Sequence, residues 1–408
     1  MTNLKLLLCA GTAGLGLAFA GAAFADDQST TPATPPAAAP AAAAPAAPAA
    51  TPMANPAMAG PINANPHPAT FDAGPAGTIT VDGVLSGGAL FQTDPGFDAF
   101  GKRNDDAAVG LSNAALIING GVGPISFYVQ AGPYSTPSLG TPYYRESTTT
   151  SNEFGYVPQG FIKYSPNSTW SIEAGALPTL IGDEYTYTFE NMNIERGLLW
   201  NQEPAVSKGI QVNYSSGPIA ISGALTDGYY SDVYTSFSGL FTYTFKNTDT
   251  LAFAAEGDAG IAKVASFVTP EQQNNGQIYN LIFTHNAGPL VVSPYLQYSS
   301  SPYIPGVSNS GDTWGGAVLA KYQFNPEWSL AGRFEYIGSN GAANLLGYGI
   351  GSDAWSITVT PTWQKGILFA RGELSYTDVG GGTPGLMFGA QGANKDQFRG
   401  LIEAGVAF

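Results

Sequence analysis

Charged residues at alternate positions are the feature of this sequence that could do chemistry. Arg333 and Glu335 lie two positions apart, and Arg371 and Glu373 repeat the same spacing. In an extended strand, side chains two positions apart point to the same face. Each pair therefore places a positive and a negative group side by side, an arrangement that acts on ions and charged solutes through its electric field.

The same alternation places further charges on this face of the predicted strands. The full set is Lys163, Glu173, Glu256, Lys321, Arg333, Glu335, Arg371, Glu373, Arg399 and Glu403, five positive and five negative. Two interpretations remain open. The charges form self-neutralising pairs along a wall, or the arginines form a basic ladder on one side of a channel, with Arg399 as its last member.

One long connection, residues 178–204, carries five acidic residues against one basic residue. They are Asp183, Glu184, Glu190, Glu195 and Glu203, with Arg196 as the single cation. We expect this connection to fold inward and narrow a lumen, where acids facing a basic wall would create a transverse field across the constriction. The alternative is that it caps the outer mouth with its acids in solvent.

The sequence argues against catalysis and predicts no cofactor and no metal site. The single cysteine, Cys9, lies in a leader, and the two histidines are His67 and His285. A hydrolase needs a nucleophile beside a base near the long connections, whereas His285 lies beside a short turn. The Gly-rich stretch 338–351 lacks the Gly-Lys-Ser/Thr ending of a phosphate-binding loop.

The elements that must position these charges are β-strands. From Thr78 onward, segments of about ten residues alternate apolar with small or polar side chains. The seven short connections, rich in turn-forming residues, are 119–123, 165–169, 215–218, 246–250, 286–289, 325–328 and 364–366. The eight long connections are about 92–107, 132–159, 178–204, 227–237, 261–276, 300–312, 338–353 and 377–396. They alternate, which predicts sixteen strands in an all-β, antiparallel, up-and-down transmembrane barrel with short periplasmic turns and long extracellular loops.

Aromatic residues distinguish a membrane barrel from a secreted β-sandwich. In residues 355–363, Trp355, Ile357 and Val359 share one face, and serine and threonine occupy the other. Aromatic residues form two belts on the apolar faces, one beside the short turns and one at the opposite strand ends. They are Tyr164, Trp170, Tyr214, Phe245, Phe324, Trp328 and Trp363, and then Tyr298, Tyr336 and Tyr376. Belts of this kind mark the two interfaces of a membrane.

The start of the chain predicts export. Residues 1–25 combine Lys5, an apolar stretch and a small-residue site ending at Ala25, as in a cleaved signal peptide. Residues 26–77 are rich in alanine and proline and contain no lysine or arginine, which predicts a disordered, extended periplasmic linker. We favour a simple tether, with binding to the cell wall or another periplasmic partner as the alternative. The barrel then spans residues 78–408.

The formal net charge is −15, and most of the negative charge of the barrel lies in the long connections. An acidic mouth raises the local concentration of cations and repels anions, which predicts a mild cation preference. Acidic loops that bridge surface lipids through divalent ions are the alternative. A nucleic-acid partner is not expected from this charge.

The region around the acidic connection resembles a known family. It runs Gly175-Ala-Leu-Pro-Thr-Leu-Ile-Gly-Asp-Glu184, then Asn191, Arg196, Leu198-Leu199-Trp200, Pro204 and Gly209. This pattern is similar to the hallmark region of the OmpL-like outer-membrane porin family, whose members often have an Ala/Pro-rich start. The chain departs from the pattern at Ala176-Leu177, where a basic-aromatic pair is usual, and at Glu195, where serine is usual. The resemblance implies a barrel and a porin role.

Together these features predict a porin of the bacterial outer membrane in a Gram-negative organism, passing ions and small hydrophilic solutes by passive diffusion. Phe408 ends a strand that resembles the signal bound by the barrel-assembly machinery, and lipid and lipopolysaccharide would surround the wall. Sixteen-stranded porins are commonly trimers, so we expect a homotrimer by analogy. A structural or adhesive surface barrel with a closed lumen is the main alternative, and a membrane hydrolase is the least favoured one.

Overall fold

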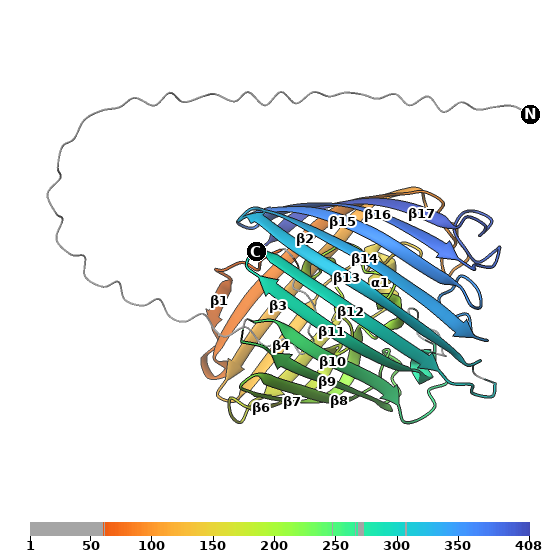
Figure 1. Cartoon of the computed structure of the whole chain (residues 1–408). Helices are drawn as coiled ribbons and strands as arrows, with labels where there is room; N and C mark the ends of the chain where they lie inside the picture. Colours follow the sequence, from red (N-terminus) through yellow and green to blue (C-terminus); the bar gives the residue numbers. More distant parts are fainter. Residues whose placement is uncertain (1–59, 61, 247, 266, 268–272, 307) are drawn as a thin grey trace, which may run out of the picture. The chain divides into compact units, whose positions relative to one another are not determined.

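A computed structural model describes residues 60, 62–246, 248–265, 267, 273–306 and 308–408. Among them, sixteen strands, β2 to β17, form a closed antiparallel barrel, because neighbours in the chain pair and β17 pairs with β2 (Figure 1). The predicted fold class and strand number are confirmed. Within the described residues, no helix is long and apolar enough to cross a membrane.

The elements have the following bounds. The wall strands are β2 (Thr78–Gln92), β3 (Ala107–Val122), β4 (Ile125–Ala131), β5 (Gln159–Tyr164), β6 (Trp170–Pro178), β7 (Val206–Ser216), β8 (Ile219–Thr226), β9 (Ser236–Thr244), β10 (Thr250–Asp258), β11 (Gln277–Ala287), β12 (Leu290–Ser301), β13 (Gly311–Asn325), β14 (Trp328–Gly341), β15 (Asp353–Lys365), β16 (Leu368–Gly380) and β17 (Asp396–Ala407). The others are β1 (Ala69–Asp72), α1 (Glu146–Asn152) and the 3-10 helices η1 (Gly74–Ala76), η2 (Thr188–Glu190), η3 (Trp200–Gln202) and η4 (Gln273–Asn275).

The strands have an inside-out pattern of burial. In β15, Ile357 and Val359 are exposed on the outer face, whereas Thr358 and Thr360 between them are buried inside. A water-soluble sheet would bury the apolar face, but lipid replaces that core around a membrane barrel. The alternation predicted from the sequence is therefore the alternation that the strands show.

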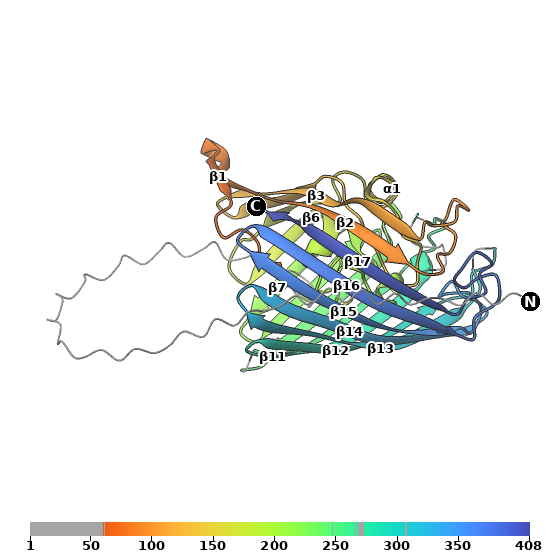
Figure 2. The same cartoon turned by 90° about the horizontal axis from the view of Figure 1, so that it is seen from above.

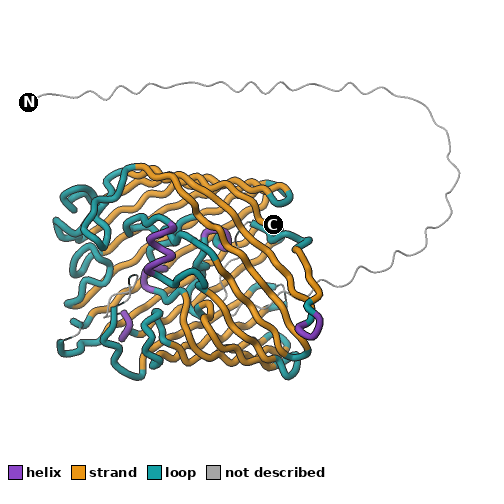
Figure 3. The backbone as a smooth tube through the Cα atoms, turned by 180° about the vertical axis from the view of Figure 1, so that it is seen from behind, coloured by secondary structure: helices purple, strands orange, loops and turns teal. Residues whose placement is uncertain are grey.

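Short and long connections lie at opposite ends of the barrel (Figures 1 and 2). We call these the short-turn end and the long-loop end. Gly217 and Gly366 take positive φ values of 57° and 56° in short turns, a conformation that glycine adopts without steric cost. Figure 3 shows the tilted strands between the two groups of loops.

Some strands run further toward the long-loop end than the sequence predicts. The expected connection 338–353 begins only after Gly341, and the expected connection 377–396 begins after Gly380. Their glycine, serine and asparagine residues are typical of loops, but they continue the ladder here, with Asn340 opposite Asp312 in β13. Pairing with a neighbouring strand outweighs local propensity at these positions.

Aromatic side chains form the two expected belts on the outer surface. At the short-turn end, Trp170 and Trp328 are each 48% exposed, and the ring of Trp170 lies 4.9 Å from that of Tyr214. Toward the long-loop end, the rings of Trp355 and Tyr376 are 5.5 Å apart. Amphipathic rings at both ends of an apolar surface are typical of membrane interfaces.

The boundary between linker and barrel differs from the expected one. Residues 26–59 and 61 of the expected linker lie outside the described residues. The described remainder lies against the barrel, and β1 pairs with the start of β2 from Ala69 opposite Val81 to Asp72 opposite Thr78. The prediction of a wholly unpaired segment up to residue 77 is therefore wrong for 69–72, a stretch without proline that keeps every backbone N–H available for a ladder.

Candidate functional site

The connection between β6 and β7 lies inside the barrel. It corresponds to the acidic connection 178–204, and most of its residues are buried, in contact with side chains from the inner faces of β14 to β17. We call it the inner loop. Its backbone forms the two short turns η2 and η3 and an isolated bridge between Arg196 and Ser138, and side chains of the wall supply further polar partners.

Arg333, on β14, joins the inner loop to the wall. Its Nη1 lies 2.5 Å from Glu184 Oε1 and also donates to the backbone oxygen of Glu195 at 2.9 Å. Its Nε lies 3.2 Å from Oε1 of Glu335, its neighbour on β14. One buried guanidinium group therefore hydrogen-bonds Glu184 and a backbone carbonyl and also forms an ion pair with Glu335.

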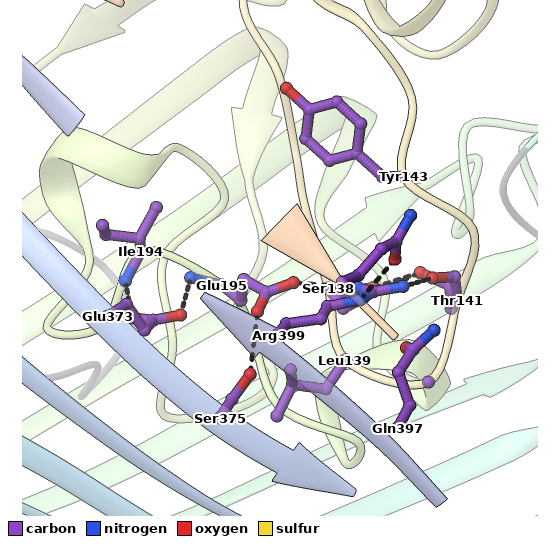
Figure 4. Close-up of polar contacts among 12 residues, drawn as sticks. Ser138, Leu139, Thr141, Tyr143, Ile194, Glu195, Glu373, Ser375, Gln397 and Arg399 are labelled. Carbon is purple, nitrogen blue, oxygen red and sulfur yellow. Dashed lines mark hydrogen bonds and ion pairs between the residues drawn. The ribbon is translucent and has the colours of Figure 1, made fainter. Parts of the chain in front are cut away.

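Arg399, on β17, makes a second junction (Figure 4). Its Nη1 lies 2.9 Å from Glu195 Oε1, and Ser375 Oγ donates to Glu195 Oε2 at 3.1 Å. The same guanidinium group donates to the backbone oxygens of Ser138 and Thr141 in the connection 132–158. Arg399 thus fixes two separate loops to one strand.

Glu373 and Arg371, on β16, bind the backbone of the inner loop. Glu373 accepts the N–H groups of Ile194 at 2.5 Å and Glu195 at 2.9 Å (Figure 4). Arg371 donates to the backbone oxygens of Thr188, Asn191 and Met192 at 2.7, 3.0 and 2.8 Å. The Glu373 carboxylate thus accepts hydrogen bonds from the loop's N–H groups, and the Arg371 guanidinium group donates to its carbonyl groups. An irregular segment needs such partners, because few of its backbone groups pair with each other.

Glu403 lies beside this group on β17. Its Oε2 is 3.5 Å from Arg371 Nη1, and its Oε1 accepts hydrogen bonds from Ser86, Asn113 and Thr188. Thr188 belongs to the inner loop, so Glu403 links that loop to β2, β3 and β17. Six of the predicted wall residues therefore form one docking network, namely Arg333, Glu335, Arg371, Glu373, Arg399 and Glu403.

The arrangement differs from the expected transverse field. The acids Glu184 and Glu195 do not face the basic wall across a gap but touch it, so their charges and those of Arg333 and Arg399 compensate each other at contact. The physical reason is that an unpaired buried charge costs far more than a paired one. Lys163 of β5 and Glu173 of β6 form a self-neutralising pair on the wall, as the other interpretation expects. The distance between Lys163 Nζ and Glu173 Oε1 is 2.9 Å.

Among the remaining predicted residues are Lys321, Asp183, Glu190 and Arg196. Lys321 lies near the short-turn end of β13, opposite Ala331 of β14. Asp183 is fully buried, Glu190 is half-buried, and burial raises the pKa of Glu190 from its ordinary 4.5 to about 7. Arg196 is fully buried with its guanidinium carbon 5.4 Å from the centre of the Trp200 ring, and burial lowers its pKa to about 10.

The opposite side of the inner loop is apolar. Leu180, Ile181 and Leu199 pack in one buried cluster with inward side chains of β10 to β14, including Ile282 and Leu319. The loop is therefore held between a charged wall and an apolar wall. Apolar burial adds to the ion pairs in fixing its position.

A glycine permits the close approach to the charged wall. A Cβ atom at Gly197 would lie 2.3 Å from Glu335 Oε2 and 2.9 Å from Glu184 Oε2, so these carboxylates would have to shift to make room for it. The Gly197 backbone N–H donates to Glu184 at 2.8 Å. The sequence shows this glycine directly after Arg196, but only the packed structure shows why the position must be small.

Two cavities lie on either side of the inner loop. One of about 370 Å³ opens toward the long-loop end and is lined by Glu153, Trp200, Glu203 and Tyr229, among others. The other, of about 260 Å³, lies toward the short-turn end, and Glu190 is part of its lining. The inner loop therefore borders one cavity toward each end of the barrel.

Glu153 was not predicted from the sequence as a site residue. It follows α1 in the connection 132–158, and Thr136 Oγ1 donates to both of its carboxylate oxygens at 2.8 Å. Burial raises the pKa of Glu153 to about 8. The length of this connection was the available signal, because a long connection in a barrel is able to reach the lumen, but its charge pattern is unremarkable.

His285, which the sequence offered as the only histidine of the barrel, lies beside a pair of short turns. His285 Nδ1 lies 3.0 Å from both carboxylate oxygens of Asp249, at the short-turn end. This pair joins two neighbouring turns, because Asp249 also accepts the N–H of Asn286 at 2.9 Å. In the part of the chain that the structure describes, no group of three or more His, Cys, Asp or Glu side chains is placed to hold a metal ion.

A closed sixteen-strand barrel with an apolar outside, aromatic belts, a charged inner wall and a loop inside it defines a porin-type barrel of the bacterial outer membrane. The sequence of residues 78–408 matches the family described as "Putative beta-barrel porin-2, OmpL-like", and the chain belongs to this family. No curated protein matches it.

Solved structures with this fold share little sequence with the chain. The outer membrane channel DcaP of Acinetobacter baumannii is 10% identical with a TM-score of 0.56, over 83% of this chain and 100% of that one. A loop-deletion mutant of OmpT, an outer membrane protein of Vibrio cholerae, is 14% identical with a TM-score of 0.54, over 82% and 100%. A trimer form of OmpT is 12% identical with a TM-score of 0.53, over 81% and 99%. At these identities the likeness shows the fold alone.

Proposed function

We propose that the protein is a diffusion porin, a water-filled channel for ions and small hydrophilic solutes, in which the inner loop constricts the lumen. The observation that carries this proposal is the docking network, since Arg333, Arg371 and Arg399 fix the loop at a set depth inside the wall. A fixed loop between two cavities sets the width of a path more reproducibly than a mobile loop does. Membership of a porin family and a channel among the structural neighbours support the same function and favour a channel over an enzyme.

Mild cation selectivity is the second part of the proposal. Glu153 and Glu203 line the long-loop cavity and Glu190 lines the short-turn cavity, whereas the cations of the network are paired with carboxylates. Carboxylates that border the path raise the local concentration of cations once they are ionised, and because burial raises the pKa of Glu190 to about 7 and that of Glu153 to about 8, this effect grows as pH rises through those values. The ionised acids of the two cavities therefore set the sign of the selectivity, and the paired wall charges contribute little to it.

A structural or adhesive barrel with a closed lumen is the second candidate, because one observation favours it. Leu180, Ile181 and Leu199 pack directly against inward Ile282 and Leu319, so part of the lumen cross-section is dry and filled. An apolar cluster that fills part of the lumen cross-section narrows the channel, and one that fills the whole cross-section closes the channel. The two candidates differ in permeability alone.

The partners of the porin are part of the proposal, and its outer surface supports them. The apolar belt contacts outer-membrane lipid and lipopolysaccharide, and the last strand, which ends beside Phe408, is the segment that the barrel-assembly machinery would bind. A homotrimer is part of the proposal, and the trimer form of the OmpT structure supports it as a precedent for this fold.

Liposome swelling tests the proposed function. The purified full chain is placed in vesicles loaded with a polymer, and the vesicles are diluted into isotonic solutions of uncharged sugars of increasing size. The porin proposal predicts fast swelling with the smallest sugars and a steep fall with size. No swelling with any sugar, from a protein whose strand content by circular dichroism is intact, would favour the closed barrel.

A further inference from the structure

The end of the Ala/Pro-rich segment enters the lumen from the short-turn end. The described residues Gly60 and 62–65, here called the mouth segment, border the 260 Å³ cavity together with the wall and the inner loop. This placement goes beyond the tether that composition predicts. Three contacts along the mouth segment show that it is built into the barrel.

The inner end of the mouth segment touches the constricting loop. The N–H of Gly60 donates to the backbone oxygen of Glu190 at 2.7 Å. A Cβ atom at Gly60 would lie 2.7 Å from the backbone oxygens of Glu190 and Asn191, so a larger residue would collide with the loop. Glycine at this position permits a backbone-to-backbone contact inside the lumen.

In the middle of the mouth segment, the apolar side chain of Ile62 lies against an apolar part of the inner wall. Ile62 packs against a buried cluster that contains Val84 of β2, Phe189 of the inner loop, Phe369 of β16 and Ala407 of β17. The three strands are neighbours in the wall, and Phe189 of the inner loop packs against their inner faces. An isoleucine placed there removes apolar surface from water, which stabilises the docked position.

The outer end of the mouth segment is fixed to the rim. The backbone N–H of Asn63 donates to Gln364 Oε1 at 2.7 Å, and Gln364 Nε2 donates to the backbone oxygen of Asn63 at 2.9 Å. One side-chain amide thus pairs with both backbone groups of a single residue, as a neighbouring strand would. Gln364 lies at the end of β15, beside a short turn, so this contact marks the rim of the barrel.

We propose that the mouth segment is an autoinhibitory plug, which occupies part of the short-turn mouth and limits the flow of solutes through the pore. Its described residues contact the constricting loop at Gly60 and the rim at Asn63, and β1 further along the chain pairs with the start of β2. A chain held at both ends across the mouth excludes solute from the volume that it fills. This inference rests on the proposed channel function.

The test compares single-channel conductance of the full chain with that of two undocked variants. Gln364→Ala removes both bonds to Asn63, and Ile62→Asp places a charge in the apolar cluster, so each variant releases the mouth segment. Gln323→Ala is the matched control, because Gln323 is also at a short turn but donates to Asn325 and Trp328 of its own hairpin. We expect a larger open-channel conductance for both variants and an unchanged one for the control.

Thiol labelling provides a measurement that does not depend on conductance. A cysteine at Ile62, which is half-buried, should react slowly with a maleimide in the wild-type background and faster with Gln364→Ala, whereas a cysteine at exposed His67 should react fast in both. Equal conductance of wild type, Gln364→Ala and Ile62→Asp, or fast labelling at position 62 in the wild type, overturns the plug. No conductance in any variant would instead remove the proposed channel function, and the plug with it.

Discussion

Glu184 and Arg333 are 149 positions apart in the chain, and their side chains meet at 2.5 Å inside the barrel. Both side chains are buried, so neither charge has water as a substitute partner. This contact, together with the one between Glu195 and Arg399, turns an acidic loop and a basic wall into one fixed unit.

Breaking the Glu184–Arg333 contact should destabilise the inner loop and not the barrel wall. Arg333→Met leaves the buried carboxylates of Glu184 and Glu335 without their cation, which costs about 3–5 kcal/mol in comparable buried pairs. We expect noisier and larger single-channel currents, with strand content by circular dichroism unchanged. Lys365→Met is the control, because Lys365 pairs with Glu327 on the exposed surface of a short turn.

The double variant Arg333→Met with Glu184→Gln sharpens this test. If the two residues act through their contact, the double variant should be less destabilised in urea than the sum of the two single variants. Simple additivity of the two effects would mean that the contact does not hold the loop.

Gly197 should tolerate no side chain. In Gly197→Ala the new Cβ atom would meet the carboxylate oxygens of Glu335 and Glu184 at less than carbon–oxygen contact distance, so these carboxylates or the loop must shift, which disturbs their contacts with Arg333. We expect a lower urea midpoint and a changed conductance. Gly223→Ala on β8 is the matched control, because a Cβ atom there has no neighbour within 4 Å. Equal effects of the two substitutions would argue against the close docking of the loop.

Apolar packing should matter on the other side of the inner loop. Leu319 is fully buried beneath the loop, and Leu319→Ala should destabilise the folded barrel by about 2–5 kcal/mol, as in other buried sites. Leu296 of β12 is 63% exposed on the outer face, so Leu296→Ala serves as the control with a smaller loss expected. Urea unfolding in lipid measures both. A larger loss at Leu296 than at Leu319 would place the main packing outside the lumen.

Selectivity should depend on pH through Glu190. Burial raises its pKa from 4.5 to about 7, so the group is largely neutral below pH 7 and charged above it. We expect the preference for cations to increase as pH rises through about 7, and Glu190→Gln to reduce that increase. The reversal potential in a KCl gradient measures it, and an identical pH profile for Glu190→Gln would exclude this residue as the cause.

The same shift has a consequence for stability. Because the folded protein binds the proton of Glu190 more tightly than the unfolded chain does, the contribution of this group to the free energy of unfolding is fully present below pH 4.5. It is lost as pH rises from about 4.5 to about 7. Glu190→Gln should abolish this part of the pH dependence in urea unfolding.

The sequence predicted the barrel well because its signals are local. Alternation between Trp355 and Trp363 reports the two faces of one strand, and turn residues such as Gly217 and Pro218 mark one end of the wall. Strand ends near Gly341 and Gly380 were misplaced because their composition is that of a loop while their pairing is that of a strand.

The partners within the site could be predicted less well. The inward charges of Arg333 and Arg399 follow from alternation, but the residues they touch depend on how an irregular loop folds through the lumen. Asn63 and Gln364 are 301 positions apart in the chain, and no periodic pattern in the sequence indicates that they pair. Long-range contacts of irregular segments need the three-dimensional structure.

Single-channel recording of the purified full chain in a planar bilayer under a KCl gradient tests the central claim most directly. The proposed porin predicts stepwise conductance with a reversal potential that favours cations, and a weaker preference in the Glu190→Gln variant. A correctly folded barrel that gives no current, in the wild type and in Gln364→Ala alike, would contradict the porin and leave a closed structural barrel as the function.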